Sequence, residues 1–217
     1  MFSTGALIYQ FRGPWGVPVQ VGSSILLLAL LFVMGSTTPE DFFYSAIFFG
    51  LVMLSIYLHE LGHAWGALIQ GIPVSRVVLY GGGGFCEHCS GTPRESELIV
   101  AMGPIVNLTL WAICSLIAPA IDDPALYWLI SSTAMINIFL AVLNLLPVLP
   151  LDGGRLLHLL FLRFMPERPA LILSGLVGLL LAVLWIPLMI LSFVFFGLVL
   201  FFIPSISLHW RMLRDAL

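Results

Sequence analysis

Long apolar stretches separated by short polar segments run through most of the 217-residue chain. A helix needs about 20 mostly apolar residues to cross the hydrocarbon core of a bilayer. The pattern predicts an all-α polytopic membrane protein, with spanning helices at residues 23–35, 42–70, 97–121 and 125–147, followed by an uncharged run at 169–203.

The uncharged run at 169–203 would be about 50 Å long as one helix, which exceeds the thickness of a bilayer. We therefore predict two short spans that turn near 185–187, which brings the total to about six. With this count all eight arginines lie on one side of the membrane. An excess of Arg and Lys marks the cytoplasmic side, so both termini are expected in the cytoplasm.

Three segments organise the predicted protein: an N-terminal cytoplasmic or interfacial segment at 1–22, a six-span core at 23–203 and a cytoplasmic tail at 204–217. A strand is also allowed at 17–21. After the second helix, a strand-like run at 77–80 is followed by four glycines at 81–84. We expect a short β-hairpin or re-entrant segment there, whose edge could pair with an extended substrate. A flexible loop is the alternative.

Composition excludes several classes of protein. The chain is 60% hydrophobic and 9% charged, whereas soluble domains carry about 25% charged residues. The formal net charge of −3 leaves no basic surface for nucleic acid. Three cysteines are too few for a disulfide framework. The segment Cys86-Glu87-His88-Cys89 is only a weak metal motif, because no second pair accompanies it.

Candidate chemistry lies near the end of the second predicted helix. His59 and His63 are four residues apart, so one helix face presents both imidazoles to a single metal ion. Glu60 lies beside that face, where it can act as a base toward water. This His-Glu-x-x-His pattern predicts a catalytic zinc site; a solvated cluster at a helix end is the alternative.

A catalytic zinc site usually has three protein ligands. Asp152 is the best remaining candidate, because Pro147 and Pro150 interrupt helix geometry before it and two glycines follow it. The alternative is that Asp152 only caps a helix at 153–165. These residues alone leave the two interpretations equally open.

The motifs together resemble the site-2 protease family of intramembrane zinc metalloproteases. Three segments carry the resemblance: His59-Glu60-Leu61-Gly62-His63, Gly103-Pro104-Ile105-Val106-Asn107 and residues 144–153, which end Leu151-Asp152-Gly153. The resemblance implies that His59, His63 and Asp152 bind one Zn²⁺ per chain. It also implies that Glu60 is the catalytic base and that the Asn144 amide stabilises the oxyanion. Asn107 is expected to support helix packing.

The resemblance implies an intramembrane metalloendopeptidase that cleaves single-span membrane proteins, such as an anti-sigma factor, a membrane-tethered regulator or a signal-peptide remnant. We expect a compact member without PDZ or CBS domains, integral to a prokaryotic plasma membrane; assembly as a homo-oligomer is left open. Leu149 departs from the family, many members of which have proline there. A zinc transporter and a non-catalytic zinc-binding scaffold are the alternative functions.

Overall fold

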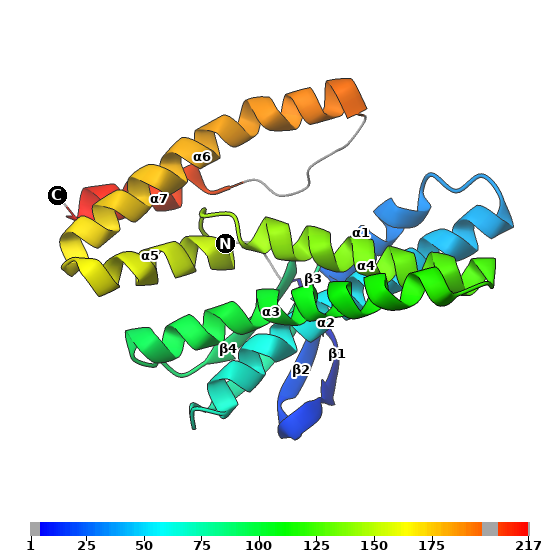
Figure 1. Ribbon diagram of the computed structural model, residues 1–217, viewed down its shortest axis with the longest axis horizontal. Helices are drawn as coiled ribbons and strands as arrows, with labels where there is room; N and C mark the ends of the chain where they lie inside the picture. The colour runs from blue at the N-terminus through cyan, green and yellow to red at the C-terminus, as the bar shows by residue number, and fades with distance from the viewer. Residues whose placement is uncertain (1–4, 197–203, 217) are drawn as a thin grey trace. The chain divides into compact units, whose positions relative to one another are not determined.

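The computed structural model describes residues 5–196 and 204–216 (Figure 1). The chain divides into two compact units, Met1–Ala141 and Val142–Leu217.

A four-stranded sheet lies in the first unit. Its strands, in the order β1-β2-β3-β4, are β1 (Leu7–Arg12), β2 (Pro18–Gly22), β3 (Val74–Tyr80) and β4 (Gly83–His88). β1 and β4 pair antiparallel with their neighbours, whereas β2 and β3 run parallel. The predicted hairpin is therefore present as β3–β4 and the strand allowed at 17–21 as β2, so the flexible-loop alternative is wrong. A 3₁₀ turn, η1 (Pro14–Gly16), connects β1 to β2.

The helices of the first unit follow the predicted apolar stretches closely. They are α1 (Ser24–Val33), α2 (Pro39–Leu68), α3 (Pro93–Ile117), the 3₁₀ turn η2 (Ala118–Ala120) and α4 (Pro124–Asn144), whose last residues belong to the second unit. Thr38 and Thr92 begin α2 and α3 with capping boxes, in which each threonine and an acid three residues later satisfy backbone N–H groups reciprocally. These caps fix where the two central helices begin.

Close contact between α2 and α3 places the end of α2 against its neighbour (Figure 1). A Cβ added to Gly62 would lie 2.6 Å from the Met102 carbonyl oxygen, and one added to Gly66 would lie 2.9 Å from Met102 Cγ. Small residues four apart let two membrane helices approach this closely. On another face of α2, Ala64 packs against the fully buried Val19 and Val77 of the sheet. The end of α2 is thus held between α3 and the sheet.

The second unit contains three further helices, α5 (Asp152–Phe164), α6 (Glu167–Phe196) and α7 (Ile206–Ala216). The predicted turn near 185–187 is wrong, because α6 continues through Trp185 and Pro187. Membrane helices tolerate an internal proline, because neighbouring groups and local backbone adjustments satisfy the backbone group that proline leaves free.

Four of the described helices are long and apolar enough to cross a membrane: α2, α3 with η2, α4 and α6. α1 is apolar but only 10 residues long. The predicted total of six spanning helices is therefore not confirmed. The four long apolar helices are those of an integral membrane protein.

Candidate metal centre

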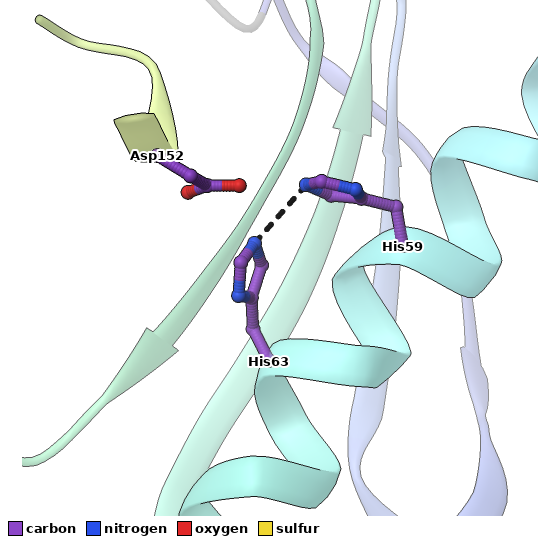
Figure 2. A group of neighbouring side chains, drawn as sticks. All are labelled: His59, His63 and Asp152. Atoms are coloured by element: carbon purple, nitrogen blue, oxygen red, sulfur yellow. Dashed lines mark hydrogen bonds between the residues drawn. The ribbon is translucent and has the colours of Figure 1, made fainter. Parts of the chain in front are cut away.

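Two buried histidines on α2 present their Nε2 atoms to each other. His59 is 5% exposed and His63 is 8% exposed, and their Nε2 atoms lie 3.1 Å apart. Figure 2 shows both rings projecting from successive turns of α2. The four-residue spacing has placed both imidazoles on one helix face, as the sequence predicted.

The Nδ1 atom of His63 is anchored on α3. It lies 2.8 Å from the carbonyl oxygen of Ile99. A carbonyl oxygen can only accept a hydrogen bond, so Nδ1 carries the proton and donates it. In the neutral ring Nε2 is then the nitrogen with a lone pair that can bind a metal. Such an anchor on the other ring nitrogen is usual for metal-binding histidines.

A chain of buried amides anchors His59 in the same way. His59 Nδ1 lies 2.5 Å from Asn107 Oδ1, and Asn107 Nδ2 donates to Asn137 Oδ1 at 2.7 Å. Asn137 Nδ2 in turn donates to the Thr133 carbonyl at 2.9 Å and to the Ser55 hydroxyl at 3.0 Å. Because the carbonyl of Thr133 only accepts, the orientation of each amide follows, and Asn107 presents its oxygen to His59. The proton of His59 is therefore on Nδ1.

The buried amides include one role that the sequence had indicated and others that it had not. Asn107 was expected to support helix packing, and its link from α3 to α2 and α4 does so; its bond to His59 is an additional role. Asn137 was not among the residues singled out from the sequence. Its amide lies within a predicted span, and because polar groups in membrane segments need partners, that position alone could have marked it as part of a polar contact.

Gly103 keeps the space beside the two Nε2 atoms open. A Cβ at this position would lie 2.5 Å from His63 Nε2 and 2.7 Å from His59 Nε2. Real carbon atoms do not approach nitrogen this closely, so any side chain would displace the rings. Two anchored imidazoles beside an open cradle fit a divalent metal of the kind that imidazole binds.

We expect Gly103→Ala to lower zinc affinity by at least about tenfold, the loss that follows when a metal ligand loses its orientation. Zinc retained against a competing chelator measures the effect. Gly50→Ala on α2 is the matched control, because no other group lies within 4 Å of its added Cβ. Equal zinc affinity in the two variants would show that Gly103 is not part of the metal cradle.

Glu60 lies next to the histidines and is covered by strand β4. It is 6% exposed. A Cβ added to Gly84 would lie 2.6 Å from Glu60 Cγ and 3.0 Å from Oε1. The backbone of β4 therefore contacts this carboxylate directly, and the hairpin limits the access of water to it.

Asp152 lies in the second unit, where it is the first residue of α5 and 6% exposed. Leu151 occupies the cap position, so the alternative in which Asp152 caps a helix at 153–165 is wrong. The glycines after it permit a tight fold, because a Cβ at Gly153 would lie 2.2 Å from the carbonyl oxygen of Leu145. Asn144, the half-buried last residue of α4, opens the same segment.

The Cys86–Cys89 segment belongs to β4 and the turn after it. Glu87 pairs with Arg76 across the β3–β4 hairpin, and His88 Nδ1 donates to the Cys89 carbonyl oxygen at 2.8 Å. Among the described residues, none of Cys86, His88 and Cys89 belongs to a group of side chains that could share a metal ion. The structure thus gives no support to a second metal site at the cysteines.

We expect Cys86 to react slowly with maleimide and Cys89 to react readily. Burial, and then the Glu60 carboxylate, raise the pKa of the Cys86 thiol to about 12, so that at pH 8 about one molecule in ten thousand carries the reactive thiolate. Cys89 is exposed. Mass spectrometry of a Cys114→Ala background checks this: Cys89→Ser should remove most labelling, whereas Cys86→Ser should leave it nearly intact. The reverse pattern would contradict the burial of Cys86.

Comparisons with known proteins found similar proteins of several organisms. Residues 120–185 match the model of peptidase family M50. The chain is 28% identical over 145 residues to a zinc metalloprotease of Methanocaldococcus jannaschii, covering 66% of this chain and 42% of that one. It is 39% identical over 110 residues to a putative zinc metalloprotease of Synechocystis, covering 49% and 29%. It is 32% identical over 123 residues to stage IV sporulation protein FB of Bacillus subtilis, covering 55% and 42%.

The chain thus spans less than half the length of these relatives. The structure matches that of the site-2 protease from Methanocaldococcus jannaschii with a TM-score of 0.64 and 21% identity, covering 97% of this chain and 94% of that one. The fold is therefore similar to that of this site-2 protease, in a chain with four helices long and apolar enough to cross a membrane. Residues 120–185 thus resemble peptidase family M50, and the fold resembles that of a site-2 protease.

Proposed function

We propose that the protein is an intramembrane zinc metalloendopeptidase that hydrolyses peptide bonds in or near the transmembrane segments of membrane proteins. The observation that carries the proposal is the anchored histidine pair on α2, with Glu60 beside it and Gly103 leaving room for an ion. Two relatives support the same chemistry by name: one is called a zinc metalloprotease and the other a putative zinc metalloprotease.

In this proposal His59, His63 and Asp152 hold one zinc ion per chain. Two imidazoles and a carboxylate form a ligand set found in zinc hydrolases, and it leaves a position for water or substrate. Zinc, when bound, supplies a Lewis acid that polarises a carbonyl and makes water nucleophilic near neutral pH. The two anchored Nδ1 atoms hold the rings in the tautomer this role requires.

The remaining steps fall to side chains of the protein. Glu60 takes a proton from the attacking water and returns it to the leaving amine. The cover of β4 over this carboxylate keeps bulk water away from it. The Asn144 amide donates a hydrogen bond to the substrate carbonyl oxygen as negative charge develops there.

We propose single-span membrane proteins as substrates: an anti-sigma factor, a membrane-tethered regulator or a signal-peptide remnant. A substrate helix hides its carbonyl groups in its own hydrogen bonds, so it must unwind before cleavage. β4 lies at the edge of the sheet and against Glu60, and a sheet edge can pair with an extended peptide. An unwound substrate bound along β4 would thus lie close to the base.

We further propose that the protein lies in a prokaryotic plasma membrane with both termini in the cytoplasm. Five arginines, at positions 76, 94, 155, 163 and 168, follow α2 or α4 and therefore lie on one side of the membrane, which supports a cytoplasmic location for that side. Water and the cytoplasmic parts of a substrate would then reach Glu60 from the same side.

Cleavage of a single-span membrane protein by the purified chain in detergent tests the proposed function. We expect cleavage that stops on treatment with a chelator and returns when zinc is added. The same preparation in vesicles should show no zinc flux. Zinc-dependent flux without cleavage would instead indicate a transporter, and zinc binding without either activity would indicate a scaffold.

A further inference from the structure

The C-terminal helix α7 places one polar side chain on its buried face. Its charged residues Arg211, Arg214 and Asp215 are exposed, whereas His209 is only 1% exposed and faces α6. α7 lies along α6 in Figure 1. Burying an imidazole is unfavourable unless it makes a hydrogen bond. An amphipathic helix would have an apolar residue at this position, so a specific contact must stabilise the buried ring.

Two glycines on α6 make room for this contact. A Cβ added to Gly178 would lie 2.1 Å from His209 Cε1, and one added to Gly175 would lie 3.0 Å from Leu213 Cδ2. The backbone of α6 at Gly178 therefore fixes where the ring lies.

The ring accepts a hydrogen bond from the segment that leads to Asp152. The Leu149 N–H donates to His209 Nε2 at 3.1 Å, across 60 residues of sequence. Burial lowers the pKa of His209, which keeps Nε2 unprotonated and able to accept near neutral pH. The turns of this segment satisfy the N–H groups of Val148 and Leu151 locally, through Leu146 and Val148 oxygens, so the bond from Leu149 connects the segment to α7.

Leu149 in turn contacts the start of α5. A Cβ added to Gly154 would lie 2.6 Å from the Leu149 nitrogen, and Val148 between the two prolines is almost fully buried. A shift of Leu149 therefore moves the backbone around Gly154, two residues after Asp152. His209 and the Asp152 carboxylate are linked through these contacts.

We propose that His209 is a positioning residue: by accepting the Leu149 N–H, the C-terminal helix holds the 145–151 segment and so orients Asp152 toward the metal. The orientation of Asp152 toward a metal rests on the proposed function. The hydrogen bond between Leu149 and His209 does not depend on the proposed function, so an experiment can test the bond and the orientation of Asp152 separately.

Two measurements on the full-length protein in detergent test this inference. The first is zinc affinity against a chelator, and the second is hydrogen exchange at the Leu149 amide. We expect His209→Leu to weaken zinc binding about tenfold and to speed exchange at Leu149 about fivefold. His209→Gln, whose Oε1 can take the place of Nε2 as acceptor, should restore both values to near wild type. Trp210→Leu, an exposed neighbour on α7, should change neither.

Wild-type values of both quantities in His209→Leu would overturn the inference. So would a His209→Gln variant as impaired as His209→Leu, because the acceptor would then be irrelevant. If His209→Leu does not fold, Gly178→Ala decides, since it displaces the ring and keeps every side chain of α7; unchanged values there would overturn the inference. If the wild-type protein binds no zinc, the proposed function is refuted. Hydrogen exchange at the Leu149 amide would still establish or refute the hydrogen bond between Leu149 and His209.

Discussion

Glu60→Gln is expected to stop peptide cleavage while leaving zinc in place. Gln has the shape of Glu but cannot accept a proton at neutral pH, so the variant loses general base catalysis, which contributes about 10²–10⁴-fold to rate. The side chain still fits beneath Gly84 of β4. Cleavage of a single-span substrate by the purified variant, with zinc content measured on the same sample, checks the expectation.

Glu40→Gln makes the same chemical change at an exposed position in the first turn of α2, and it should retain full activity. Two results would contradict the assignment of the base. Full cleavage by Glu60→Gln would show that another group accepts the proton. Loss of zinc from the variant would show that Glu60 instead serves to hold the metal.

Asp152→Ala is expected to lose most of its zinc. Removing a direct ligand should weaken binding by more than about a hundredfold, since removal of groups that only orient ligands already weakens it 10–100-fold. Cleavage should disappear with the metal. Zinc content after dialysis at defined free zinc, together with thermal unfolding of the metal-free protein, measures both consequences.

Asp122→Ala removes a carboxylate from the exposed turn before α4 and is the control, with expected zinc content equal to wild type. Asp152→Asn keeps the size of the side chain and removes its charge, and it should also lose zinc. Retention of zinc by both Asp152 variants would exclude Asp152 as the third ligand. Loss of zinc in Asp152→Ala alone would indicate a role in packing.

Local geometry explains why part of the site could be predicted from the sequence. His59 and His63 share a helix face because four residues make about one helical turn, and that relation needs no knowledge of the rest of the fold. The same holds for the apolar stretches of α2, α3 and α4, whose bounds differ from the predicted ones by a few residues. The hairpin was also readable, because glycines separate two runs suited to strands.

Contacts between distant segments could not be predicted in this way. The parallel pairing of β2 with β3 joins segments more than 50 residues apart, and no periodicity marks it. The bond from Leu149 to His209 and the amide chain behind His59 are of the same kind. At Pro187 the prediction failed for another reason: the sequence suggested a break, but membrane helices tolerate an internal proline, and α6 continues through this one.

The amide chain behind His59 has one more consequence. Asn107, Asn137 and Ser55 connect three helices to a single imidazole, so this ring is held in its metal-binding orientation by the same bonds that join the helices. For the proposed binding of zinc, this ring would need no rotation, and we expect loading to be limited by delivery of the ion to the site.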